Sequence, residues 1–459
     1  MSRMPRSSLL IAALAFGCLA ADLAAQRFQG RRRPGREESG AAPAAEAPKA
    51  ERKVAAWTAI VGGDVHTGDG NVLRGATVLL GDDKIEKVGH DVEIPAAATR
   101  IDASGKVVAP GFCVVRLQGV AAGGGGDVRD DLNPFDPSIK MALAAGITSF
   151  LWQSSGGSNT PAGKSAVVKL AYGDLAGMVR EENSVVSMRV PLDPASMANL
   201  RKLVRQARDH LDKLREFEGK ADAKPEDRPK PPQGSEDILA VMQGRKRLWI
   251  GAAGGGIGFG GMMMNRGGGG YAVREVRQAL EVAELVGNGV VLDLPIEAWV
   301  IPDEVAATAS MAIVTPRNVV AADAGRPDDT GSNIAQAAIL DAAGVPITVT
   351  VPVGGYGGGP TVGTGGILGR DLNTPNIEAA FAVRGGYPSR KALRILTLDA
   401  ARIMGAERRI GSIEAGKDAD ILILDGDPLN YKTFVQTALV NGKVVYRKDE
   451  EPFYRHIQR

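Results

Sequence analysis

An alternation of apolar and amphipathic segments between residues 110 and 405 constrains the fold more than any other feature of this sequence. Apolar runs typical of buried strands occur at 145–153, 247–253, 289–295, 310–316 and 344–352. Helical patterns lie among them at 271–287, 332–344 and 375–386. Repeated strand-then-helix units favour parallel strands, because a parallel connection needs a long crossover that a helix usually supplies. The α/β class is therefore predicted, and the number of repeats favours a (β/α)8 barrel of the TIM type over 110–405.

Residues 57–109 and 406–447 differ from the middle of the chain. Both consist of short strand-like runs separated by Gly-Asp and Asp-Asp turns. Because the same pattern occurs at both ends, we expect the two segments to form one small β-sandwich domain. A C-terminal tail at 448–459 follows the second segment.

Two insertions interrupt the predicted barrel. Residues 203–235 form a charged helical stretch followed by a Pro-rich loop, and residues 251–270 are mostly Gly and Met. The second insertion follows a predicted strand end, on the face where barrel active sites form. Two interpretations stay open for it: a lid or contact surface over the barrel mouth, and a segment without a role.

The N-terminus has the organisation of a secretory signal peptide. Arg3 and Arg6 precede an apolar run at 9–21, and a small-residue cleavage site ends near Ala25. The run is shorter than the roughly 20 residues that a membrane span needs, so an integral membrane protein is not expected. We predict a signal peptide at 1–25, a disordered linker at 26–55, and a secreted or periplasmic product. Whether Cys18 is lipidated stays open.

Charge and cysteine content exclude several classes of function. The chain has 55 basic and 53 acidic residues, and this balance provides no concentrated basic face for nucleic acid. After signal cleavage only Cys113 would remain, so neither an intramolecular disulfide nor a zinc site made of several thiolates is expected. We interpret Cys113 as a buried core residue rather than a reactive thiol.

Several motifs together resemble the amidohydrolase superfamily, in its imidazolonepropionase-like branch. They are DASGKVVAPGF at 102–112, the long segment from ALRILTLDAARIMG to ILILDGDPL at 392–429, and QTALVNGKVVY at 436–446. A further segment at 132–173 is similar to one found in exported members. The resemblance spans most of 57–447. It implies a metal-dependent barrel, flanked by a composite β-sandwich, that hydrolyses carbon–nitrogen bonds in amides or cyclic amides.

The resemblance also implies where metal ligands should stand, and this chain departs from that pattern. The family places His-x-His after strand 1, histidines at strands 5 and 6, and an aspartate at strand 8. The corresponding residues here are Arg116, Gln118, Gly251, Asp293 and Pro352. Arginine stays protonated and repels a cation, so the zinc or other divalent metal usual in the family is not expected. We predict a degenerate metal site and no cofactor.

The histidine inventory supports the same interpretation. The chain has four histidines: His66, His90, His210 and His456. None follows a predicted barrel strand, and we expect each to be a surface or turn residue rather than a ligand. By fold analogy Arg116 would face Asp293 across the barrel mouth, where an ion pair would replace metal–ligand bonds.

Three functions stay open at this point. The first is a metal-free, non-catalytic or ligand-binding member that takes a small molecule in the barrel mouth, alone, as a homo-oligomer or beside a paralogue. The second is an active hydrolase with a non-standard site, for which nearby carboxylates at Asp127, Asp131 and Glu297 are candidates beside Asp293 and Arg116. The third is a structural envelope protein that docks through its basic linker.

Overall fold

The computed structural model describes residues 53–121, 127–154, 158–220, 224–252, 272–322, 325, 329–351, 362–363, 375–452 and 454–457. From Val54 onwards the chain forms one compact unit. The predicted signal peptide, almost all of the predicted linker and nearly all of the insertion at 251–270 lie outside the described residues.

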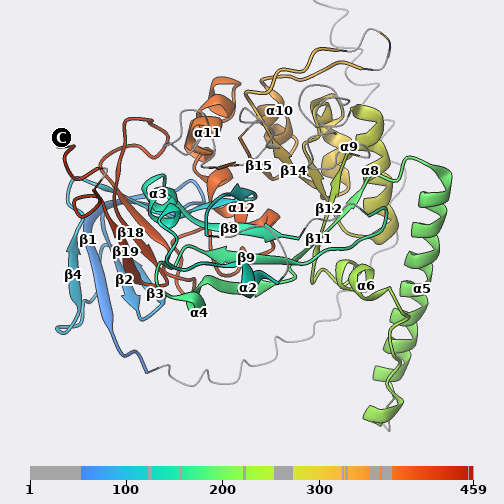
Figure 1. Ribbon diagram of the computed structural model, residues 1–459, viewed down its shortest axis with the longest axis horizontal. Helices are drawn as coiled ribbons and strands as arrows, with labels where there is room; N and C mark the ends of the chain where they lie inside the picture. Colours follow the sequence, from blue (N-terminus) through green and yellow to red (C-terminus); the bar gives the residue numbers. More distant parts are fainter. Residues whose placement is uncertain are drawn as a thin grey trace, which may run out of the picture. The chain divides into compact units, whose positions relative to one another are not determined.

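Strands from the two ends of the chain pair in one eight-stranded sheet (Figure 1). Its strands are β1 (Trp57–His66), β2 (Val72–Gly81), β3 (Lys84–Gly89), β4 (Thr99–Asp102), β5 (Val107–Pro110), β17 (Ile421–Leu424), β18 (Val435–Val440) and β19 (Lys443–Arg447). The order is β19-β18-β17-β5-β1-β2-β3, and β4 pairs with β1. The two ends meet where β17 runs antiparallel to β5, with Leu422 opposite Ala109.

The middle of the chain contributes three further sheets to the described structure. A parallel sheet has the order β11 (Val185–Arg189), β12 (Arg247–Gly251), β13 (Val291–Asp293), β14 (Met311–Val314) and β15 (Ile347–Val349). A second has the order β10 (Val179–Glu182), β9 (Ser165–Lys169), β8 (Ile147–Gln153) and β6 (Phe112–Val114). The third pairs β7 (Leu117–Gln118) with β16 (Val362–Gly363). Each apolar run predicted as a strand contains one of these strands.

Helices connect and cover these strands. They are α2 (Val128–Asp131), α3 (Ser138–Ala144), α4 (Leu175–Met178), α5 (Pro194–Glu218), η1 (Pro225–Asp227), α6 (Glu236–Met242), α8 (Val273–Val286), η3 (Ala298–Val300), α9 (Pro302–Ala307), α10 (Gln336–Ala342), α11 (Pro375–Arg384), η4 (Ser389–Lys391), η5 (Arg394–Leu396) and α12 (Leu398–Ile403). The three predicted helical segments correspond to α8, α10 and α11.

The prediction of parallel strands is wrong between β8 and β10. There β8 runs antiparallel to β9, and β9 runs antiparallel to β10. Only residues 154–164 connect β8 to β9, and Ser154 N donates to Lys164 O at 2.9 Å. So short a connection makes a hairpin, since a parallel pair would need a crossover of a dozen residues or more. Strand pairing among the described residues does not close the sheets into a ring, and the architecture is a mixed α/β fold.

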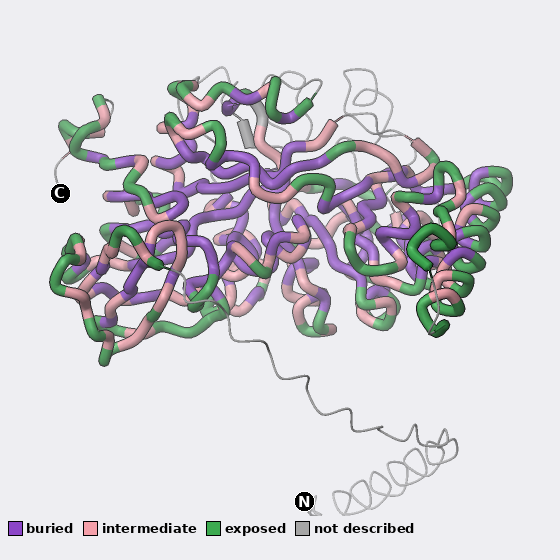
Figure 2. Tube along the Cα trace, turned by 90° about the horizontal axis from the view of Figure 1, so that it is seen from below, coloured by how far each residue is buried: buried purple, intermediate pink, exposed green. Residues whose placement is uncertain are grey.

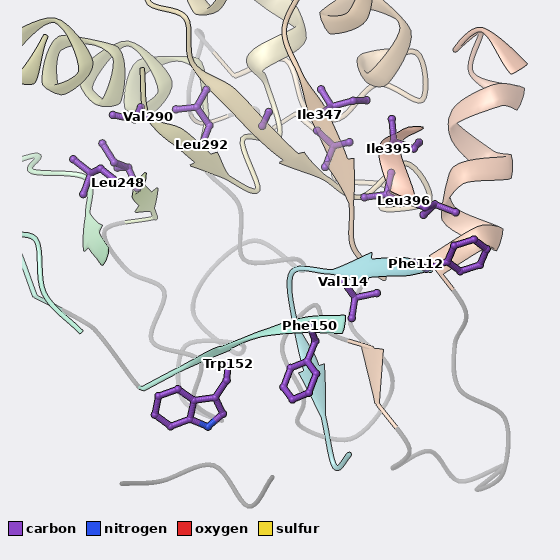
Figure 3. Close-up of a cluster of buried hydrophobic side chains, with 14 of the residues drawn as sticks. Phe112, Val114, Phe150, Trp152, Leu248, Val290, Leu292, Ile347, Ile395 and Leu396 are labelled. Atoms are coloured by element: carbon purple, nitrogen blue, oxygen red, sulfur yellow. The ribbon is translucent and has the colours of Figure 1, made fainter. Parts of the chain in front are cut away.

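Side chains of the central strands alternate between two buried clusters. In β6, Phe112 and Val114 belong to the larger cluster (Figure 3), whereas Cys113 belongs to a second one. This alternation is the period of two that a pleated strand imposes. The second cluster also takes side chains from β8, β9, β11, β12, β13, β14 and α12. In addition, α12 contacts both β15 and β6, the edge strands of two different sheets.

The charged insertion forms a long helix, which begins earlier than predicted. α5 is exposed along much of its length (Figure 2), and only one stripe of it is buried. That stripe contains Leu200, Val204, Ala207 and His210, at the spacing of three and four residues that places side chains on one helix face. The expectation that all four histidines are surface or turn residues is therefore wrong for His210. No helix in the described part of the chain is both long and apolar enough to cross a membrane.

Candidate functional site

An ion pair joins two of the positions where the resemblance places metal ligands. Arg116 follows β6, and Asp293 is the last residue of β13. Arg116 Nη2 donates to Asp293 Oδ2, and the two side chains are only 16% and 18% exposed. The remaining atoms, Arg116 Nη1 and Asp293 Oδ1, are buried and have no hydrogen-bond partner among the described residues. The pair therefore keeps a buried donor atom, Arg116 Nη1, and a buried acceptor atom, Asp293 Oδ1, that no described residue pairs with.

Gly251 completes this arrangement. It is the last residue of β12, the strand next to β13 in the parallel sheet. A Cβ added to Gly251 would lie 3.5 Å from Asp293 Oδ2, so the glycine stands directly beside the pair. Three of the five predicted pocket positions thus come together. Gln118 contributes backbone to β7 but its side chain is not described, and Pro352 lies outside the described residues.

The backbone turns sharply immediately after Asp293. Leu294 has φ of +61°, which is uncommon for a residue with a side chain. Its N–H donates to Ile313 O of β14 at 3.1 Å, which fixes the turn to the neighbouring strand. Strained backbone of this kind persists only where the surrounding structure imposes it, and it occurs often at binding sites.

The two acidic candidates after β6 hold other partners. Asp127 caps α2 by accepting from Arg129 N at 3.1 Å, and its side chain is half exposed. Asp131 accepts from Trp152 Nε1 at 3.0 Å. Within the described ranges, no group of three or more His, Cys, Asp or Glu side chains could hold a metal ion.

Glu297 binds backbone with both carboxylate oxygens. It has no exposed surface. Oε1 accepts from Thr330 N and Gly331 N at 2.8 and 2.7 Å, while Oε2 accepts from Val273 N at 2.9 Å. Val273 is the first residue of α8, where a negative charge also favours the helix dipole. The geometry gives Glu297 a structural role, in which it joins the start of α8 to the loop before α10.

A buried ionic cluster that the sequence analysis did not identify lies elsewhere in the fold. Lys169, at the end of β9, has no exposed surface. Its Nζ lies 2.8 Å from Asp418 Oδ2, 2.9 Å from Asp420 Oδ2 and 2.6 Å from Asn441 Oδ1. The cluster joins β9 to the C-terminal segment that enters the eight-stranded sheet. A lysine within the otherwise apolar run SAVVKL was the available signal.

Asp418 is the centre of this cluster. Burial acts to raise the pKa of its carboxyl, but the charge and hydrogen bond of Lys169, together with Lys84 and Arg409, outweigh burial. The pKa is lowered from 3.8 to about 2. Asp418 is therefore ionised in the folded protein at neutral pH, and it neutralises cations from three parts of the chain.

Comparisons with known proteins match this fold. The model of an amidohydrolase family matches residues 359–446. The 5-methylthioadenosine/S-adenosylhomocysteine deaminase of Symbiobacterium thermophilum is 31% identical over 98 residues, which cover 17% of this chain and 22% of that relative. A solved amidohydrolase from Thermotoga maritima MSB8 superposes with a TM-score of 0.58 at 23% identity, covering 85% of this chain and 100% of the other. The C-terminal part of the chain thus matches an amidohydrolase family, and the fold is similar to that of a solved amidohydrolase.

The described part of the chain does not present, at these positions, the residues that a hydrolytic zinc requires. Such an ion is held by neutral imidazoles, thiolates and carboxylates. All four histidines lie in the described residues, on β1, between β3 and β4, on α5 and near the C-terminus, and none follows β6 or β13 along the chain. At the ligand positions the guanidinium of Arg116 forms an ion pair with the Asp293 carboxylate. A fixed cation therefore stands where a metal cation would have to bind, and the two do not fit together.

Cys113 is predicted to be unreactive. It is buried, its Sγ accepts from Ser149 Oγ at 3.2 Å, and burial raises the pKa of the thiol to about 12. Since only the thiolate reacts, iodoacetamide at pH 8 should leave Cys113 unmodified in the folded protein and modify it in guanidinium chloride. Peptide mass spectrometry measures both. Rapid labelling of the folded protein would contradict the burial argument.

Proposed function

We propose that this amidohydrolase-fold protein is an exported, metal-free member that binds a small molecule at Arg116 and Asp293. The observation that carries the proposal is the ion pair itself, with one unpaired donor and one unpaired acceptor at the end of β6 and β13. Export is inferred from the signal-peptide pattern at 1–25. The inferred closed barrel is supported by the second buried cluster, which β6, β8, β9, β11 to β14 and α12 share.

The charge balance of the pair favours the loss of the metal. A carboxylate this poorly exposed needs a counter-charge, which the Arg116 guanidinium supplies through a charge-assisted hydrogen bond. Adding a divalent cation beside Arg116 would leave an uncompensated positive charge in a poorly solvated place. Arg116 and Asp293 thus stabilise the fold without a metal, and the charge of Arg116 disfavours the binding of a metal ion.

The free atoms of the pair indicate the chemical class of the ligand. Arg116 Nη1 can only donate and Asp293 Oδ1 can only accept while the carboxyl is ionised. A cis-amide edge, as in a lactam, has the complementary pattern, with a carbonyl acceptor next to an N–H donor. Because the ion pair is neutral as a whole, we propose an uncharged lactam-type ligand.

Metal analysis and ligand binding test the proposal on the purified full-length chain. After dialysis against metal-free buffer, we expect substoichiometric zinc, iron and manganese by mass spectrometry. Titration with 2-pyrrolidinone followed by NMR should show saturable binding that Arg116→Met abolishes. Arg205→Met, on the exposed face of α5, is the matched control and should bind normally. N-terminal sequencing of protein recovered outside the cytoplasm checks cleavage of the signal segment.

Three results would contradict this proposal. Stoichiometric metal that survives dialysis would contradict the metal-free proposal. Hydrolysis of a lactam or cyclic amide that Asp293→Asn abolishes would establish instead an active hydrolase with a non-standard site. Absence of 2-pyrrolidinone binding would contradict the lactam-type ligand.

A further inference from the structure

Arg189 carries a positive charge that no described residue neutralises. It is the last residue of β11, and its Nε is buried without a hydrogen-bond partner. Its backbone N–H donates to Ser158 O at 2.9 Å, but no ion pair or hydrogen bond joins its side chain to another described residue. Arginine keeps its charge at every physiological pH, and a buried donor on a cation is costly to leave unpaired. The side chain of Arg189 therefore needs a partner from outside the described chain.

The strand register places Arg189 in one row with Gly251 and Asp293. In the parallel pairing of β11 with β12, Arg189 lies opposite Gly251. In the pairing of β12 with β13, Ile250 lies opposite Leu292. Gly251 and Asp293, the next residue of each strand, are therefore neighbours as well. Since adjacent strands lie about 4.8 Å apart, the Cα atoms of Arg189 and Asp293 are separated by about 10 Å.

The three residues of this row face the same side of the sheet. Residues two or four positions earlier in β11, β12 and β13 all belong to the second buried cluster, and they are Val185, Trp249 and Val291. Because side chains alternate along a strand with a period of two, Arg189 and Asp293 project on the side of that cluster. Gly251, between them, has no side chain. Apart from its chain neighbours, the only described atoms within 4 Å of a Cβ added there belong to Asp293. The described residues thus leave the space in front of Gly251 unfilled.

The charges around this space are unequal. Arg116 and Asp293 neutralise each other, so the guanidinium of Arg189 leaves one positive charge in excess. Solvent reaches the group, because Arg189 and Gly251 are both partly exposed and the side chains of the ion pair are 16% and 18% exposed. A monovalent anion would balance the excess charge. A dianion would instead add a surplus negative charge close to the Asp293 carboxylate.

We propose that Arg189 binds a small monocarboxylate in the space in front of Gly251. A guanidinium matches the geometry of a carboxylate, to which it donates two parallel hydrogen bonds, and the unpaired Nε supplies one of these donors. The anion balances the excess charge of the row without displacing Arg116 from Asp293. It is a separate species from the lactam-type ligand, whose partners are Arg116 Nη1 and Asp293 Oδ1, and its binding does not depend on that ligand.

Titration of the purified full-length chain with acetate, at constant ionic strength, tests this site. Saturation-transfer NMR on the acetate methyl group measures the dissociation constant. We expect saturable binding that Arg189→Met weakens by about tenfold or more, because the charged donor is lost. Gly251→Val keeps the guanidinium but fills the space, and it should weaken acetate binding to a similar extent. Arg205→Met, an exposed change on α5, is the matched control and should bind acetate as the unmodified chain does.

The outcomes distinguish this anion site from the proposed function, because the probe is acetate rather than 2-pyrrolidinone. Absence of saturable acetate binding, or binding that Arg189→Met leaves unchanged, would overturn the anion site while the lactam-type ligand is tested separately. Binding that survives in Gly251→Val would contradict the location in front of Gly251. Sulfate that displaces acetate at a lower concentration than propionate does would contradict the preference for a monocarboxylate.

Discussion

Replacing Lys169 by methionine is expected to lower the free energy of unfolding by about 3–5 kcal/mol, the usual cost of removing one partner from a buried ion pair. Asp418 would keep Lys84 and Arg409, but Asp420 would lose the cation that lies 2.9 Å from its Oδ2. A carboxylate that is almost fully buried would then be without a counter-charge. Urea unfolding, followed by circular dichroism, measures the difference.

The matched control is Lys202→Met, an exposed lysine on α5, which should change stability by less than about 0.5 kcal/mol. The pH dependence supplies a second readout. The folded pKa of Asp418 is lowered, so its contribution is present above 3.8 and is lost as the pH falls through about 2. The difference between the unmodified chain and Lys169→Met should therefore shrink over this range. Equal stability of the two lysine variants at pH 7 would show that the cluster contributes little.

The second large effect is expected from the Arg116–Asp293 pair. Arg116→Met and Asp293→Leu should each lower the free energy of unfolding by about 1–3 kcal/mol, because each leaves a poorly exposed charge without its partner. The double variant leaves no such charge and should be less destabilised than the sum of the single variants. Chemical unfolding of all four proteins forms a double-mutant cycle, and a coupling energy of about 1–3 kcal/mol is expected.

A surface pair provides the comparison for that cycle. Arg277 and Glu304 are joined at 3.0 Å, but their side chains are 57% and 49% exposed. Ion pairs between solvent-exposed side chains contribute about 0–1 kcal/mol to the free energy of unfolding. If the coupling between Arg116 and Asp293 were no larger than that of the surface pair, the pair could not be the stabilising replacement for a metal that we propose.

The order of strands and helices was largely predictable, because burial on one or both faces imposes a period on the sequence. The runs at 247–253, 289–295 and 310–316 became β12, β13 and β14. The antiparallel β8–β9–β10 segment was not predicted. An apolar run can belong to a parallel or an antiparallel strand, so it does not specify strand direction. The direction of β9 relative to β8 depends on the connection between them, which is a short segment containing Gly and Ser.

The candidate site was predictable in part. At Arg116 and Asp293 the sequence differs from the ligand pattern of the superfamily that it resembles. Fold analogy predicted that these two residues face each other. The structure contains that ion pair. The backbone bonding of Glu297, a candidate site carboxylate, was not predictable, since its three donors come from two segments that only the fold brings together.

The sequence by itself determined the α/β class, the positions of most strands and the absence of histidine from the positions compared with the family's ligands, since these depend on local pattern and residue type. Only the tertiary structure decided which charges meet. Arg116 and Asp293 are 177 positions apart, and Lys169 and Asp418 are 249 apart. Burial then determined the chemistry of each pair, because a charge removed from water must find a partner within a few ångströms, and no local pattern specifies which distant residue that will be.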